Sequence, residues 1–190
     1  MRFAFTKINL WQQIQYRKIV YLDADIIALR APDELFNLEH TLAAAPDIGW
    51  PDYFNSGVMV LTPSMSEYWS LHTLAASGTS FDGADQGLLN QYFCQRPWHR
   101  LSFAYNCTPS ASYQYEPAYR YNRSNINMVH FIGREKPWIQ GRQALERTEG
   151  VYRELLGIWW STYDRHYRIA VGRSECLDNM QAEKLSLIHI

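Results

Sequence analysis

Two aspartates one residue apart are the residues of this sequence best suited to metal chemistry. Asp23 and Asp25 lie in an apolar, β-branched stretch, residues 18–29, at the predicted end of a strand covered on both faces, as in a parallel α/β sheet. Ligands of such sheets bind beyond the carboxyl ends of the strands. Because two adjacent carboxylates repel each other and lose hydration there, they favour a hard divalent cation. We therefore predict a metal site, with a metal-bound diphosphate as the substrate group.

A lone Asp-x-Asp pair is also common in turns, so the prediction depends on polar clusters elsewhere in the chain. His130 lies in an apolar strand, where a histidine is more often a core residue, but beside two aspartates it is a candidate third metal ligand. Lys136 precedes a Pro-Trp pair that stiffens its position, and its compact charge suits phosphate oxygens. In an α/β sheet these residues can meet at one edge with the other clusters, which are Asp52 with Asn55 and the group Asp82, Asp85 and Gln86.

The elements that must position these side chains follow from periodicity and from turn residues. Ser64 and Glu67 have the spacing of a capping box, and Gly78 ends the helix that they begin. We predict helices over residues 6–17, 65–76, 87–93 and 146–167. We predict strands ending at residue 23 and over residues 41–45, 54–61, 100–105 and 126–132. The sheet is expected to be mixed and mostly parallel.

Composition limits the functional classes. A chain of 190 residues with 47% hydrophobic and 19% charged residues is expected to form one globular domain. The 15% of aromatic residues suits either a carbohydrate-binding surface or an aromatic core. A formal net charge of −1 without a basic stripe argues against nucleic-acid binding. Cys94, Cys107 and Cys176 show neither zinc nor disulfide spacing, and no leader or membrane-spanning stretch is evident, so a cytoplasmic protein is expected.

Several short motifs also occur in a distinctive order, at residues 7–11, 22–25, 45–47, 50–52, 54–58, 81–90 and 130–138. In this order they resemble the glycogenins, which are retaining family 8 glycosyltransferases, over roughly residues 5–140. The resemblance implies a Rossmann-like, nucleotide-sugar-binding α/β fold of the GT-A type. The implied glycosyltransferase domain covers residues 1–173, and residues 174–190 form a tail.

The resemblance implies a reaction as well. Enzymes similar to this chain take glucose from UDP-glucose, attach it to their own tyrosine and extend an α-1,4-glucan primer for glycogen synthesis. By position, Asp23, Asp25 and His130 match the Mn²⁺ ligands, with Mg²⁺ as an alternative ion. Lys136 matches a lysine that contacts the diphosphate, and Lys7 matches a lysine near the donor sugar.

The implied catalytic residues and acceptor follow from the same match. Asp85, Asp82 and Lys136 are the implied catalytic residues, and both a covalent intermediate on Asp85 and attack from the same face remain open. Tyr113 matches the self-glucosylated tyrosine, and Tyr115 is the second candidate. The implied substrate-binding residues are Lys7, Asp23, Ala24, Asp25, Asp47, Asn55, Ser56, Asp82, Asp85, Gln86, His130, Gly133 and Lys136.

The chain departs from the family before Lys7. Family members carry a further stretch there, with the first βαβ segment and its uracil-binding loop, so we expect an incomplete UDP pocket and weak or absent activity. A glycogen-synthase-binding segment is not evident, and that partnership is not expected. The full-length protein is expected to form a homodimer.

Alternative functions stay open at this point. Another family 8 hexosyltransferase could transfer galactose to a small acceptor such as inositol. A non-catalytic fragment could bind the full-length enzyme. Phosphatases that use Asp-x-Asp would need a threonine soon after the pair, which residues 26–28 do not supply.

Overall fold

The computed structural model describes residues 5–108 and 115–167. The chain divides after His130 into two compact units, which are described separately here. The predicted domain over residues 1–173 spans both units, and the predicted tail over residues 174–190 lies outside the described residues.

The first unit is built on a sheet with the strand order β1-β4-β3-β5. These strands are β1 (Ile19–Leu22), β3 (Leu42–Pro46), β4 (Phe54–Leu61) and β5 (His99–Arg100). β4 pairs antiparallel with both β1 and β3, and among the described strands only β3 and β5 pair in parallel. The predicted mostly parallel sheet is therefore wrong for this part of the chain. The short connection over residues 47–53 suits an antiparallel hairpin, because a parallel crossover needs a longer segment.

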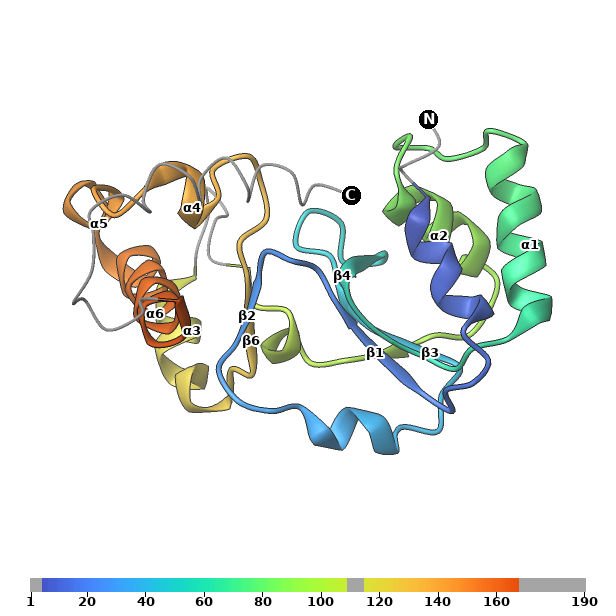
Figure 1. Ribbon diagram of the computed structural model, residues 1–190, viewed down its shortest axis with the longest axis horizontal. Coiled ribbons are helices and arrows are strands. Elements are labelled where there is room, and N and C mark those ends of the chain that lie inside the picture. Colours follow the sequence, from blue (N-terminus) through green and yellow to red (C-terminus); the bar gives the residue numbers. More distant parts are fainter. Residues whose placement is uncertain (1–4, 109–114, 168–190) are drawn as a thin grey trace. The chain divides into compact units, whose positions relative to one another are not determined.

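Both faces of this sheet are covered, which explains why every residue of β4 is buried. On one face, Leu42, Met59 and Leu61 pack against η1 (Thr6–Gln12), α1 (Met65–Ala76) and α2 (Asp85–Phe93) (Figure 1). On the other face, Val58 and Val60 pack with η2 (Asp33–Asn37). Successive residues of β4 alternate between the two clusters, as the pleat of a strand requires.

A short second sheet completes the strands of the first unit. β2 (Ile26–Ala28) pairs antiparallel with β6 (Met128–His130), so that Ile26 lies opposite His130. The remaining elements of this unit are η3 (Phe103–Tyr105), α3 (Glu116–Asn122) and η4 (Arg123–Asn125). The predicted strand over residues 100–105 is wrong, because only its first residue pairs and η3 follows.

The helices differ from prediction mainly at their ends. The helix at residues 65–76 is confirmed, and the Ser64 Oγ accepts a hydrogen bond from the Glu67 backbone N–H at 3.4 Å. The predicted helix over residues 6–17 is a 3₁₀ helix that ends at Gln12. The predicted helix over residues 146–167 begins at Gly150.

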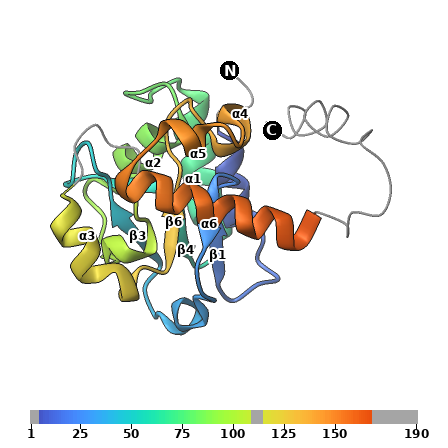
Figure 2. The ribbon, with the colours of Figure 1, turned by 90° about the vertical axis from the view of Figure 1, so that its left-hand side faces the viewer.

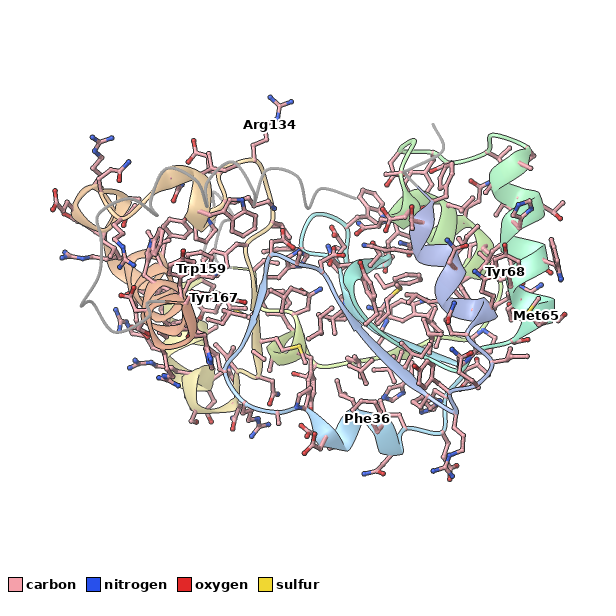
Figure 3. The ribbon with its side chains drawn as sticks, in the orientation of Figure 1. Phe36, Met65, Tyr68, Arg134, Trp159 and Tyr167 are labelled. Atoms are coloured by element: carbon pink, nitrogen blue, oxygen red, sulfur yellow. The ribbon has the colours of Figure 1, made fainter. Side chains whose placement is uncertain are left out.

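The second unit consists of three helices in its described residues. α4 (Pro137–Gln140) and α5 (Ala144–Arg147) each pack against the long helix α6 (Gly150–Tyr167), as Figure 2 shows. Along α6, Tyr163 stacks between Trp159 and Tyr167, the two residues of this helix labelled in Figure 3. No helix among the described residues of the chain is long and apolar enough to cross a membrane.

Candidate functional site

Asp23, Asp25 and His130 come together where the two sheets of the first unit meet. Asp23 follows β1, Asp25 precedes β2, and the pairing of β2 with β6 brings His130 beside them. One ligand atom from each residue lies within 4.8 Å of the others. The His130 Nε2 is 3.2 Å from the Asp25 Oδ1, and the His130 side chain is buried. Two carboxylates and one imidazole suit a divalent transition metal such as Mn²⁺.

The buried side chain of Asn106 orients His130, and sequence reasoning missed it. The His130 Nδ1 is 2.9 Å from the Asn106 Oδ1, while the Asn106 Nδ2 donates to the Asn55 Oδ1 at 2.8 Å. Because the amide nitrogen is engaged by Asn55, its oxygen faces the imidazole and accepts from Nδ1–H. The Nε2 lone pair is then directed to the carboxylates, which is the arrangement that metal-binding histidines use. No local pattern marks Asn106, since its place depends on the contact of Cys107 with β6.

Replacing Asn106 by leucine should weaken Mn²⁺ binding by about 10- to 100-fold, because the imidazole loses the partner that fixes its tautomer. Electron paramagnetic resonance of free Mn²⁺ in a titration measures this affinity without any turnover. Asn122→Leu is the matched control, since it makes the same change at an exposed asparagine of the first unit and should leave the affinity unchanged. Unchanged Mn²⁺ affinity in a folded Asn106→Leu variant would remove Asn106 from this role.

Lys7 connects the metal-binding group to a second cluster of polar side chains. Its Nζ lies 3.0 Å from the Asp23 Oδ1 and 2.8 Å from the Asp85 Oδ2. It also donates to the Ser56 Oγ at 3.1 Å, and that hydroxyl donates to the Asp85 Oδ2 at 2.9 Å. The Lys7 ammonium group thus links η1 to three other places: the end of β1, the strand β4, and the first residue of α2. The carboxylates of Asp23, Asp25 and Asp85 outnumber this cation, so the pocket retains negative charge for a metal ion.

Asp47 directly follows β3, and its carboxylate accepts hydrogen bonds from the side chains of Asn55 and Gln86 and from two backbone N–H groups. Its Oδ1 accepts from the backbone N–H groups of Gly49 and Trp50 at 2.8 and 3.2 Å. Its Oδ2 accepts from the Asn55 Nδ2 and the Gln86 Nε2 at 3.1 and 3.0 Å. Burial raises the pKa of Asp47, but these hydrogen bonds outweigh burial and hold the pKa below its usual value. The carboxylate is therefore ionised at neutral pH and acts only as an acceptor.

Tyr21 is a second residue that sequence reasoning missed. Its hydroxyl donates to the Asp23 Oδ1 at 2.7 Å, and the Lys7 Nζ lies 5.2 Å from the ring centre. Burial, the hydrogen bond to Asp23 and the neighbouring carboxylates raise the pKa of Tyr21 far above neutrality, so the hydroxyl remains a donor. Its position two residues before Asp23 on a strand, and therefore on the same face, was the available signal.

The other predicted site residues each have surroundings of their own. Asp82 is exposed in the loop before α2, where its Oδ1 accepts from the Ala84 backbone N–H at 2.8 Å. Ala24 is exposed between Asp23 and Asp25. The Lys136 Nζ donates to the Phe131 backbone oxygen at 2.8 Å within the second unit.

Three further predicted residues lie among the described residues, and a fourth does not. Gly133, in the second unit, has a φ of 96°, a conformation that favours glycine. Tyr115 is exposed directly before α3, and Tyr113 lies outside the described residues. Asp52 is exposed, with one carboxylate oxygen 4.0 Å from the Arg100 Nη2.

Comparison with known proteins identifies the family. Residues 2–141 match the sequence profile of Glycosyl transferase family 8. The chain is 62% identical over 165 residues to Glycogenin of Neurospora crassa, covering 87% of this chain and 24% of that protein. It is 41% identical over 174 residues to Glycogenin-1 of Mus musculus, covering 84% of this chain and 51% of that protein. The chain thus spans about half the length, or less, of the curated relatives it matches.

The fold agrees with this match. The solved structure of the glycosyltransferase GlyE from Streptococcus pneumoniae TIGR4 superposes with a TM-score of 0.57 at 23% identity, covering 84% of this chain and 44% of that chain. The predicted α/β fold of the GT-A type is confirmed. Since the family match covers most of the chain and contains the metal-binding group, the resemblance drawn from the motifs is confirmed as well, and the chain belongs to glycosyl transferase family 8.

Proposed function

We propose that this chain carries the catalytic part of a metal-dependent, glycogenin-like glucosyltransferase that transfers glucose from UDP-glucose to a tyrosine and extends an α-1,4-glucan. The observation that carries the proposal is the linkage of the Asp23, Asp25 and His130 group through Lys7 to Asp85. A cation site beside a polar pocket suits a substrate that joins a diphosphate to a sugar. The high identity to a glycogenin supports glucose as the sugar.

Asp23, Asp25 and His130 would hold Mn²⁺, since an imidazole among the ligands suits Mn²⁺ better than Mg²⁺, which prefers an all-oxygen shell. When bound, the ion supplies positive charge that stabilises the departing diphosphate. Lys136, with the turn at Gly133, is proposed to add a second positive charge to the same phosphate oxygens.

The pocket around Asp85 is proposed to hold the glucose. Asp47, Asn55 and Gln86 form a hydrogen-bonded set that can exchange its internal partners for sugar hydroxyls. Asp82 and Ser56 would complete this set, and the backbone at Ala24 would contact the donor. Asp85, held by Lys7, would stabilise the positive charge that develops at the anomeric carbon.

The test of this function is intact-mass spectrometry after incubation with UDP-glucose and Mn²⁺, with EDTA and UDP-galactose controls. The expected result is a weak ladder of added hexoses that needs Mn²⁺ and UDP-glucose. Tyr113→Phe should abolish the ladder but spare transfer to an added maltoside, while Tyr115→Phe should change little. Loss of the ladder only in Tyr115→Phe would move the acceptor to that residue. A folded chain that also carries the stretch found before Lys7 in family members, and still transfers hexose to neither tyrosine nor maltoside, would contradict the proposal.

We further propose that transfer occurs between two copies of the chain in the cytoplasm. A homodimer would let the tyrosine of one copy enter the pocket of the other, and the free thiols of Cys94 and Cys107 suit a reducing compartment. Mixing Asp25→Asn, which keeps Tyr113, with Tyr113→Phe, which keeps the pocket, should place hexose on the Asp25→Asn chain. An unmodified Asp25→Asn chain in this mixture would exclude transfer between copies. Cell fractionation tests the location.

A further inference from the structure

Three aromatic side chains form an exposed surface on two loops of the first unit. Trp50 and Tyr53 belong to the loop between β3 and β4, and Phe81 to the loop between α1 and α2. Their exposed fractions are 60%, 39% and 59%. The ring centres of Tyr53 and Phe81 lie 5.3 Å apart with an interplanar angle of 30°, and those of Trp50 and Tyr53 lie 6.3 Å apart at 34°. We call these three residues the aromatic platform.

The aromatic platform is not part of the buried core. None of its three residues belongs to either of the two clusters that cover the sheet. Three neighbouring exposed rings are a candidate binding surface, because a ligand that covers them removes apolar area from water. Aromatic ring faces carry partial negative charge, and they attract the C–H groups on the face of a pyranose. Asp52 directly precedes Tyr53, and Asp82 directly follows Phe81. Both carboxylates are exposed and offer acceptors for the hydroxyls of such a sugar.

The two loops that carry the aromatic platform also carry the proposed glucose-binding residues. In the first loop, Asp47 accepts from the Trp50 N–H at 3.2 Å, and its own N–H donates to the Tyr53 backbone oxygen at 2.9 Å. In the second loop, Phe81 directly precedes Asp82, and α2 begins three residues later at Asp85. Asp47 is joined to α2 by the Gln86 side chain at 3.0 Å. The loops that carry the aromatic platform are thus joined through Asp47 to the proposed glucose-binding residues.

We propose that the aromatic platform is the subsite for the glucan acceptor, where successive glucose rings of an α-1,4-linked chain stack on Trp50, Tyr53 and Phe81. This assignment rests on the proposed glucosyltransferase function. The platform holds the chain so that its non-reducing end points to Asp85, where glucose is added. A longer glucan covers more of the three rings than a single glucose does, so the platform favours chains that have already been primed.

Binding of maltohexaose without any donor, measured by titration calorimetry, tests this subsite. Trp50→Ala and Phe81→Ala should each weaken binding by about three- to tenfold, as expected for the loss of one stacked ring, and the double variant by more than tenfold. Tyr16→Ala, which removes an equally exposed aromatic ring from another part of the unit, should leave binding unchanged. Maltose should bind more weakly than maltohexaose. Cellohexaose, whose β-1,4 linkage presents the rings differently, is the stereochemical control.

The outcomes separate this subsite from the proposed reaction. In transfer assays, Trp50→Ala and Phe81→Ala should raise the KM for maltohexaose while UDP binding stays unchanged. Equal maltohexaose affinity in the wild type and both variants overturns the subsite, even where glucose transfer is intact. Absence of maltohexaose binding in the wild type overturns it as well. Platform-dependent binding in a chain that transfers no glucose supports the subsite and contradicts the proposed reaction.

Discussion

Asp25→Asn is expected to reduce Mn²⁺-dependent glucose transfer by about 100-fold or more. Loss of a residue that binds the metal directly should reduce activity at least as much as loss of a residue that only orients a metal ligand. The substitution keeps the size of the side chain and removes one of the two negative charges at the cation position. It also removes the carboxylate that faces the His130 Nε2 at 3.2 Å. In this variant the divalent ion would lose one ligand and part of the negative charge that balances its own. Metal affinity should therefore fall by more than the stability of the fold does.

Two measurements separate these contributions for Asp25→Asn. Initial rates of UDP release across a range of Mn²⁺ concentrations give the loss of activity, and electron paramagnetic resonance gives the loss of bound ion. Asp33→Asn is the matched control, since it removes one negative charge from an exposed position on η2 and should change neither quantity. Wild-type turnover by Asp25→Asn at limiting Mn²⁺ would show that Asp25 is not a ligand.

Gly57→Ala is expected to destabilise the first unit by about 1–3 kcal/mol and to abolish metal binding. A Cβ atom at this position would lie 2.3 Å from the His130 Cε1, 2.7 Å from the His130 Nδ1 and 2.9 Å from the Asn55 Oδ1. Both neighbours are buried, and both are bonded to Asn106, so neither has a free direction in which to move. The imidazole must leave its position beside Asp25, which removes one predicted metal ligand.

Urea denaturation followed by circular dichroism, together with the same Mn²⁺ titration, checks the prediction for Gly57→Ala. Gly157→Ala is the matched control, because the nearest atom to its added Cβ is 4.0 Å away, on Leu145. An alanine inside helix α6 should leave the chain as stable as the wild type or more stable by up to about 1 kcal/mol. An unchanged urea midpoint and unchanged Mn²⁺ affinity in Gly57→Ala would mean that the strand can shift to accept the methyl group.

The sequence predicted that Asp23, Asp25 and His130 come together because these residues carry strong local signals. Asp23 and Asp25 are polar residues that interrupt an apolar stretch, and His130 ends a short apolar strand. Such residues must either be solvated or share a site, and their contact needs only that the two strands pair. The register of β2 with β6 supplies that contact.

The direction of the strands and the supporting residues could not be predicted in the same way. A run such as β4, buried on both faces, has the same composition whether its neighbours are parallel or antiparallel, so the mostly parallel sheet was wrong. Asn106 is distant in sequence from both of its partners, Asn55 and His130. Its role follows from tertiary packing, which no local periodicity encodes. The predicted strand over residues 100–105 failed for a related reason, since only His99 and Arg100 reach β3.

The side-chain amides of Asn55 and Asn106, which connect Asp47 to His130, help to fix the tautomer of that histidine. Each amide has one donating end and one accepting end. His130 donates to Asn106, Asn106 donates to Asn55 and Asn55 donates to Asp47, so the three hydrogen bonds run in one direction. An ionised carboxylate can only accept, which selects that direction and excludes its reverse. Asp47 and the Gly57 backbone N–H, which donates to the Asn55 Oδ1 at 3.0 Å, both fix this direction, and with it which imidazole nitrogen of His130 carries the proton. Removing the charge of Asp47 alone would leave the Gly57 N–H in place, so two independent groups hold His130 in one tautomer.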